Sequence, residues 1–291
     1  MRYSYATVSL PTLTPAEAVV ELRESGFEGV EWKVGDAPHA AGSNAADFLL
    51  GNRCTLAPTL EAAEEAARLC AQQGLAVVGL TPYVSVGDVE GMRLVLDMAD
   101  RAGAPQVRLQ AQRVRDGESY RVMRDDLVRF LDACLPDAHD RGVRILIEIH
   151  HRTIVPSVGL AMPILDHFDD ADLGVIYDVG NMVYEGYEDY RIGLELLGSR
   201  LRHVHLKNVG AVRTGDGSWR YEWTRLDDGL VDASHVLALL DEAGYSGWVS
   251  IEDLATYADS RDGIRYNAEV LGRVAAPGWR GGRAAPEPSR P

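Results

Sequence analysis

The stretch RILIEIHHRTIVPSVGLAMPILDHFDDADLGVIYDVG, residues 144–180, contains the repeating unit of this chain. It begins with a short run of apolar and β-branched residues at 144–150. A helix is predicted at about 158–170, and a second apolar run follows at 173–179. A strand, a helix and a strand in this order form a βαβ unit, which places two parallel strands in one sheet. The stretch therefore predicts an α/β protein with a parallel sheet.

The same alternation extends along the whole chain. Eight strand-like runs occur, at 3–10, 29–34, 76–83, 106–112, 144–150, 173–179, 201–207 and 248–254. Helices are predicted between them, most of them ending at a glycine, at 14–26, 57–74, 88–103, 118–142, 158–170, 187–198 and 232–244. Eight consecutive βα units are the number that closes a (β/α)8 TIM barrel.

The alternative fold is an open, doubly wound sheet. Such a sheet usually has a glycine-rich phosphate turn after its first strand, but the turn here reads PTLTPAE (11–17) and contains no GxGxxG. We therefore predict a single-domain α/β protein, with a TIM barrel over residues 1–273. The tail at 274–291 is rich in Gly, Pro and Arg and is predicted to be disordered.

Composition limits the classes of partner. The chain has 291 residues, 46% of them hydrophobic, and a net charge of −15, which opposes binding to nucleic acid or to an anionic membrane. It contains no run of about 18 apolar residues, and its first residues do not resemble a signal peptide. The three cysteines, Cys54, Cys70 and Cys134, form no CxxC motif and are predicted to be free thiols. A cytoplasmic protein is the expectation.

Ionisable residues collect at the carboxyl ends of the last four predicted strands, where a TIM barrel builds its active site. They are Glu148 and His150 on the fifth strand, Asp178 on the sixth, His203, His205 and Lys207 on the seventh, and Glu252 on the eighth. Residues two apart in a strand share a face, so Glu148 points with His150, and His205 points with Lys207. Each side chain taken alone has an ordinary structural explanation. Together, converging carboxylates and an imidazole are best explained by a divalent cation, which these residues do not identify among Mn²⁺, Mg²⁺, Co²⁺ and Zn²⁺.

Four motifs now suggest a relationship: IEIH (147–150), YDVGNM (177–182), HVHLKN (203–208) and GWVSIED (247–253). In combination they resemble the xylose-isomerase-like barrel family. That family includes sugar-phosphate isomerases and epimerases, ketose 3-epimerases and hydroxypyruvate isomerases, with endonuclease IV as a distant relative.

The resemblance implies roles for individual residues. Glu148, Asp178, His205 and Glu252 would hold one metal ion, Mn²⁺ first among the candidates, and Glu148 and Glu252 would also be the acid/base pair. Where the family often has a substrate-contacting histidine, three residues after the strand-six aspartate, this chain has Asn181. The implied mechanism agrees with general chemistry, because a cation stabilises the charge that develops when a proton is removed next to a carbonyl.

Two further residues are candidates for catalysis. His150 is a second candidate base. Only two of the 29 basic residues are lysines, Lys33 and Lys207. A lysine differs chemically from an arginine, so we hypothesise that Lys207 holds a developing oxyanion or a substrate hydroxyl, and that Lys207→Arg lowers turnover while leaving stability nearly unchanged.

Two long connections could border the site. The segment 208–229 carries Trp219, Tyr221 and Trp223, and it is expected to be either a lid or binding loop, or a subunit interface. The predicted substrate-binding residues are Asn181, His203, Trp219 and Trp223. In the segment 35–57, the residues Asp36, His39 and Arg53 are expected at the rim.

Four functions are considered for this set of residues, and the first two are favoured. The first is a metal-dependent sugar isomerase or epimerase. The second is a lyase or dehydratase acting on a 3-oxo-sugar or 3-oxo-glycoside, similar to the catalytic subunit of C-glycoside deglycosidases. An apurinic-site endonuclease is disfavoured, because strands three and four have no histidine and the net charge is −15. A non-catalytic sugar-binding barrel is disfavoured by the four metal-ligand residues. The expected partner is a carbohydrate, with a homo-oligomer and a hetero-oligomer with a small subunit both left open.

Overall fold

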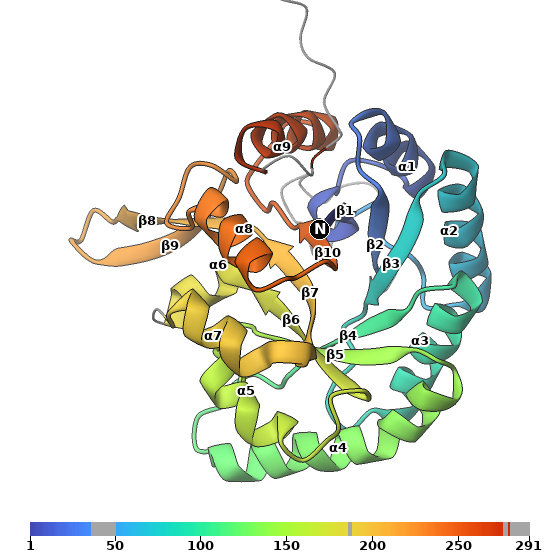
Figure 1. Ribbon diagram of the computed structural model, residues 1–291, viewed down its shortest axis with the longest axis vertical. Coiled ribbons are helices and arrows are strands. Elements are labelled where there is room, and N and C mark those ends of the chain that lie inside the picture. Colours follow the sequence, from blue (N-terminus) through green and yellow to red (C-terminus); the bar gives the residue numbers. More distant parts are fainter. Residues whose placement is uncertain (36–50, 186–187, 276–278, 280–291) are drawn as a thin grey trace, which may run out of the picture.

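Eight parallel strands close into a barrel in the computed structural model, which describes residues 1–35, 51–185, 188–275 and 279 (Figure 1). The strands are β1 (Arg2–Ala6), β2 (Gly29–Lys33), β3 (Ala76–Thr81), β4 (Gln106–Gln110), β5 (Arg144–Glu148), β6 (Leu173–Asp178), β7 (Leu201–Leu206) and β10 (Trp248–Ile251). Neighbouring strands pair in parallel around the circle, and β10 pairs with β1 to complete it. The predicted TIM barrel is confirmed.

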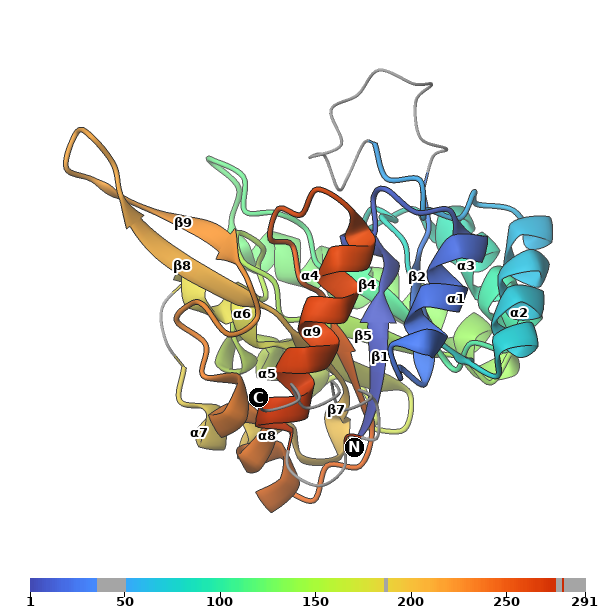
Figure 2. The same ribbon diagram turned by 90° about the horizontal axis from the view of Figure 1, so that it is seen from above.

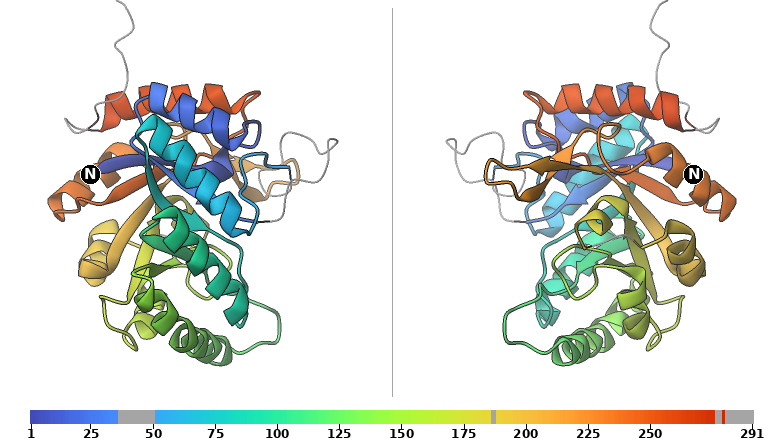
Figure 3. Two further views of the ribbon diagram at one scale, coloured as in Figure 1. Left: turned by 90° about the vertical axis from the view of Figure 1, so that its right-hand side faces the viewer. Right: turned by 90° about the vertical axis from the view of Figure 1, so that its left-hand side faces the viewer.

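Eight main helices cover the outside of the barrel (Figures 1 and 3). They are α1 (Pro15–Glu24), α2 (Leu60–Gln73), α3 (Val89–Ala102), α4 (Tyr120–Asp140), α5 (Val158–Leu165), α7 (Tyr190–Leu197), α8 (Ala233–Glu242) and α9 (Ser260–Val274). Their ends follow local signals. Thr14 and Glu17 form a capping box at the start of α1, and Gly74 ends α2 with a φ of 66°, a conformation that glycine adopts without strain.

The strands are shorter than predicted at their carboxyl ends. The run 3–10 was expected to be one strand, but β1 ends at Ala6 and Thr7–Ser9 form a 3-10 helix. Likewise β10 ends at Ile251, one residue before Glu252. The first residues after β5 and β10, Ile149 and Glu252, each still donate one backbone hydrogen bond to the neighbouring strand, to Ile176 and Leu206 respectively.

The long connection after β7 is an antiparallel hairpin and not an irregular loop. Strand β8 (Asn208–Arg213) pairs with β9 (Trp219–Thr224), from Asn208↔Thr224 at one end to Arg213↔Trp219 at the other. The turn TGDG (214–217) between two alternating segments is a hairpin signal in the sequence, distinct from the βα pattern of the barrel. Figure 2 shows the hairpin projecting from the side of the barrel opposite the amino terminus.

Other predictions concern the cysteines, the tail and membrane spans. Cys54, Cys70 and Cys134 are free and buried, as predicted. In the predicted tail, Val274 ends α9 and the Trp279 ring packs edge-on against Tyr3 at 5.3 Å. The remainder of the tail prediction falls outside the described residues. No helix in the described part of the chain is both long and apolar enough to cross a membrane.

Candidate metal centre

Four side chains from four neighbouring strands meet at the carboxyl end of the barrel. Glu148 ends β5, Asp178 ends β6, His205 lies in β7, and Glu252 follows β10. Each contributes one potential ligand atom, and these atoms lie within 4.8 Å of one another. All four residues are buried. The predicted set of metal ligands is therefore brought together, and we call it the quartet.

Hydrogen bonds hold the carboxylates of the quartet in place. Asp178 Oδ1 accepts from the backbone N–H of Asn181 at 2.9 Å, and its Oδ2 accepts from Asn181 Nδ2 at 2.8 Å. Arg108 on β4 donates from Nη1 to Glu148 Oε2 at 3.1 Å. Asn181 thus contacts the quartet directly.

The donor atoms of the quartet fit a divalent cation. Nδ1 of His205 is buried and has no hydrogen-bond partner among the described residues. It lies 3.4 Å from Glu148 Oε1, 3.5 Å from Asp178 Oδ2 and 3.8 Å from Glu252 Oε2. An imidazole nitrogen facing three carboxylates is a donor set that suits a hard or borderline divalent cation. These residues could hold a divalent metal ion.

Lys207 lies at the edge of the quartet. Its Nζ is 2.8 Å from Asp178 Oδ2 and also contacts Glu252 Oε2. Burial by itself would lower the pKa of Lys207, but the carboxylates of Asp178 and Glu252 raise it, so the ammonium stays charged. A Cβ on Gly180 would come within 2.4 Å of Lys207 Cγ, so this approach requires a glycine there. Lys207 therefore lies on the inner face, in contact with two carboxylates of the quartet.

The two glutamates of the quartet have different surroundings. Burial would raise the pKa of Glu148, but Arg108 and then His150 oppose it and hold the pKa well below its usual range. For Glu252 burial prevails over Lys207 and His205, and the pKa is raised. In the metal-free protein one glutamate is therefore strongly ionised while the other holds a proton more readily.

Aromatic rings form a wall beside the quartet, made by His150, His151, Tyr184 and Trp223. His150 stacks on His151 with ring centroids 4.5 Å apart, and His151 stacks on Tyr184 at 4.3 Å. Trp223 of β9 lies 5.2 Å from Tyr184, and Lys207 Nζ lies 4.9 Å from the Trp223 ring. We call these four residues the aromatic wall.

The predicted substrate-binding residues are not all near the quartet. Trp223 belongs to the aromatic wall, whereas Trp219 lies at the outer end of the hairpin ladder and is 68% exposed. His203 is fully buried, and its Nε2 lies 3.2 Å from Glu31 Oε2. The roles of the hairpin as lid or as subunit interface both stay predictions.

Of the three residues predicted at the rim, only Arg53 lies in the part of the chain that the structure describes. Arg53 donates to the backbone oxygen of Thr12 at 2.8 Å, while Asp36 and His39 lie outside the described residues. Lys33, the other lysine, is buried on β2 and donates from Nζ to Thr55 Oγ1 at 3.0 Å.

Two buried charged residues near the quartet were missed from the sequence. Arg108 is the only charged residue of β4, and a lone arginine in a buried strand indicates a carboxylate partner. Glu31 shares a face of β2 with Lys33 by the same alternation that identified His205 and Lys207. The signal is present in both strands, which lie outside the four strands that carry the quartet.

Comparison with known proteins agrees with this architecture. The family model described as "Xylose isomerase-like TIM barrel" matches residues 19–274. The inosose dehydratase of Geobacillus thermodenitrificans is 30% identical over 145 residues, which cover 46% of this chain and 47% of that protein. The chain thus matches about half the length of this curated relative.

Solved structures are similar in fold over nearly the whole chain. The 3-keto-D-glucoside 4-epimerase of E. coli superimposes with a TM-score of 0.70 at 15% identity, covering 94% of this chain and 99% of that one. A xylose isomerase-like TIM barrel protein from Mycobacterium smegmatis, solved in complex with magnesium, has a TM-score of 0.66 at 18% identity and covers 94% of this chain and 98% of that one.

Proposed function

The chain belongs to the xylose isomerase-like TIM barrel family, and from this premise we propose that it is a divalent-metal-dependent dehydratase acting on an oxo-sugar or a cyclic oxo-polyol. The observation that carries the proposal is the quartet with Lys207 in contact with it. Glu252 as a base and the charged Lys207 as an acid lie next to each other in this site. The removal of water next to a carbonyl requires both.

The metal would be held by Glu148, Asp178, His205 and Glu252, and we propose Mn²⁺ as the first ion to test. When bound, it supplies a Lewis acid that polarises the substrate carbonyl. Arg108 and Asn181 hold the carboxylates of Glu148 and Asp178 in the orientation in which their oxygens face His205.

The proton transfers are assigned to Glu252 and Lys207. Glu252 removes the proton from the carbon next to the carbonyl, and the electron pair of that C–H bond forms the new C=C bond. The hydroxyl on the following carbon leaves with a proton from the Lys207 ammonium, so one water is released. Because Lys207 and Glu252 are in direct contact, the proton on Glu252 can pass to the lysine and restore both groups.

The dehydration outcome is supported by the relatives. Several curated relatives with detectable sequence similarity are named inosose dehydratases. An inosose is a cyclic ketone bearing a ring of hydroxyls. The aromatic wall supports a ring-shaped substrate, because flat aromatic faces pack well against the apolar face of such a ring.

A second candidate is an epimerase on the same substrate class. The observation that favours it is the placement of Glu148 at the end of β5 and of Glu252 directly after β10, with β6 and β7 between the two strands. Two carboxylates approaching a bound substrate from different strands could remove a proton from one face and return it to the other.

The test is incubation of the metal-loaded enzyme in D2O with an inosose and, separately, with a 3-keto-glucoside. Dehydration gives a product lighter by one water, whereas epimerisation gives an isomer of unchanged composition with deuterium at the carbon next to the carbonyl. Chelation should abolish either reaction and Mn²⁺ should restore it. Absence of both products and of deuterium exchange with the loaded enzyme would contradict the proposal for these substrates.

Two variants separate the assigned roles. Glu252→Gln should lose both deuterium exchange and dehydration. Lys207→Met should keep exchange next to the carbonyl but lose the release of water, because only the acid has been removed. If Lys207→Met dehydrates at the wild-type rate, the assignment of Lys207 as the acid is wrong.

A further inference from the structure

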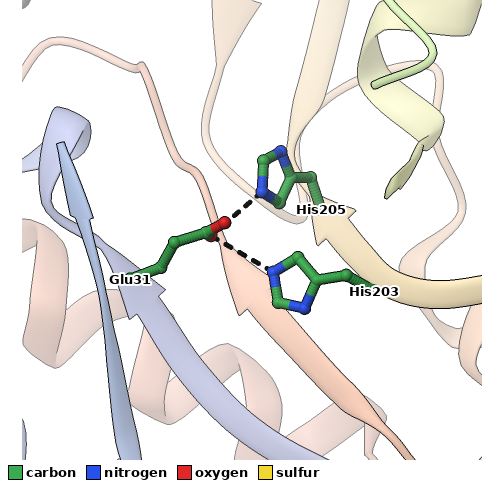
Figure 4. A group of neighbouring side chains, drawn as sticks. All are labelled: Glu31, His203 and His205. Carbon is green, nitrogen blue, oxygen red and sulfur yellow. Dashed lines mark hydrogen bonds and ion pairs between the residues drawn. The ribbon is translucent and has the colours of Figure 1, made fainter. Parts of the chain in front are cut away.

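A second group of buried polar side chains lies behind the quartet and consists of Glu31, His203 and His205. Figure 4 shows the Glu31 carboxylate pointing from β2 toward both imidazole rings on β7. Glu31 Oε2 lies 3.0 Å from His205 Nε2 and 3.2 Å from His203 Nε2. None of the three side chains is more than 2% exposed, so water does not compete for these contacts. His205 is therefore shared between this group and the quartet.

The contact with Glu31 determines which nitrogen of His205 carries a hydrogen. A carboxylate oxygen only accepts, so Nε2 of His205 carries a hydrogen toward Glu31, and Nδ1 is the nitrogen left to bind a cation. That Nδ1 is the buried nitrogen without a hydrogen-bond partner among the described residues, and it faces the carboxylates of Glu148 and Asp178. One ring thus donates on one side and offers a metal ligand on the other.

We propose that Glu31 is a positioning residue for the metal centre, holding His205 in the tautomer and orientation that present Nδ1 to the cation. His203 supports the same function by donating a second hydrogen bond to Glu31 Oε2, which keeps the carboxylate between the two rings. The inference rests on the proposed metal site but not on the reaction that takes place there. Partners that orient a metal-bound histidine typically change metal affinity by about 10- to 100-fold when they are removed.

A second cation bound by Glu31, His203 and His205 is the alternative, since their ligand atoms also lie within 4.8 Å of one another. The distances of 3.0 and 3.2 Å are those of N–H···O hydrogen bonds. Both rings would have to lose the hydrogen on Nε2 to bind an ion between them. The number of metal ions per chain distinguishes the two arrangements.

The experiment measures metal binding to the metal-free full-length protein by Mn²⁺ titration against a competing chelator. It also measures the imidazole tautomer of His205 by ¹⁵N NMR in the metal-free protein, at a pH high enough to make the ring neutral. Burial would lower the pKa of His205, but the surrounding carboxylates raise this pKa well above its usual value. The wild type should bind one ion per chain, with the hydrogen of the neutral His205 ring on Nε2. Glu31→Gln should weaken binding about tenfold or more and leave His205 as a mixture of tautomers.

Three further variants control the result. Ser4→Ala removes another buried side-chain hydrogen bond inside the barrel, to Ser250, and should leave metal affinity within about twofold of wild type. His203→Gln keeps a donor for Glu31 and should bind metal nearly as well as wild type. If Glu31→Gln does not fold, Glu31→Asp keeps the negative charge on a shorter side chain. This variant should also bind Mn²⁺ more weakly than the wild type.

The outcomes separate this inference from the proposed function. A wild-type protein that binds no ion contradicts the metal site itself. One ion per chain with equal affinity and an unchanged tautomer in Glu31→Gln overturns the positioning role alone. Two ions per chain, reduced to one by His203→Gln, overturn it in favour of a second metal site.

Discussion

Ion pairs on the outer helices differ from ion pairs inside the barrel in how their charges are stabilised. On the surface, arginines pair with acids in half-exposed positions, as Arg93 does with Glu90 and with Asp137. Inside, the carboxylates of the quartet and Glu31 lie against the buried side chains of Arg108, Lys207 and His205. Water stabilises a charge at the surface, whereas a charge in the interior needs a partner of opposite sign. The interior depends on this mutual compensation, and the quartet could in addition hold a divalent metal ion.

The two regions also differ in what an ion pair contributes. An exposed pair is worth about 0–1 kcal/mol, because water and salt screen it. Breaking a buried pair costs about 3–5 kcal/mol, since it leaves a charge without compensation. Four predictions test this contrast, beginning with the largest expected effect.

Removal of a quartet carboxylate should have the largest effect. In Glu148→Gln we expect turnover to fall by at least about a hundredfold, and Mn²⁺ to bind more weakly, because the amide supplies less charge to the cation. Steady-state kinetics and metal analysis of the purified protein measure the two effects. Full activity with bound metal in this variant would show that Glu148 is not a ligand.

Exchange of lysine for arginine inside the quartet should come next. In Lys207→Arg we expect turnover to fall about a hundredfold, because the planar guanidinium cannot occupy the position of Nζ between Asp178 and Glu252. Thermal unfolding should change little, since the positive charge is retained. Lys33→Arg on β2 is the matched control and should affect turnover less. Equal rates for Lys207→Arg and the wild type would refute the hypothesis that lysine is required.

Arg108 and Arg93 give the most direct comparison of the two regions. In the metal-free protein, Arg108→Met should lower the free energy of unfolding by about 3–5 kcal/mol, because Glu148 loses its buried partner. Arg93→Met, 43% exposed, should lower it by less than about 1 kcal/mol. Urea unfolding measures both. Saturating Mn²⁺ should reduce the loss in Arg108→Met, and equal losses in both variants would contradict the comparison.

The smallest effect is expected at the start of α1. Hydrogen bonds from Thr14 and then from Arg261 lower the pKa of Glu17 from 4.5 to about 2. A carboxyl with a lowered pKa in the folded state stabilises the protein above its unfolded pKa, and this stabilisation is lost as the pH falls. The difference in melting temperature between wild type and Glu17→Gln should be largest above pH 4.5 and vanish toward pH 2. A difference that grows in acid would contradict this explanation.

Local patterns were sufficient to predict the barrel and the strand ends at which the quartet lies. Apolar runs of period two, separated by capped helices, indicated eight βα units, and the carboxyl-end rule pointed to the ionisable residues of the last four strands. The family resemblance then singled out Glu148, Asp178, His205 and Glu252 among them. The same patterns placed Lys207 on the inner face. The sequence patterns were less accurate at the ends of the strands. Thr7–Ser9 continue the alternating pattern of β1 in the sequence, but they form a 3-10 helix and not a strand.

The sequence by itself determined the order of strands and helices and the face on which each strand residue lies, because both depend on local periodicity. Only the tertiary structure decided which side chains meet across the barrel. Glu31 contacts His203 although 172 residues separate them, and Arg108 reaches Glu148 from the neighbouring strand. Alternation assigns a residue to the interior, but its partner depends on how the strands are staggered when the sheet closes. That stagger is a property of the whole barrel and is not encoded in any one strand.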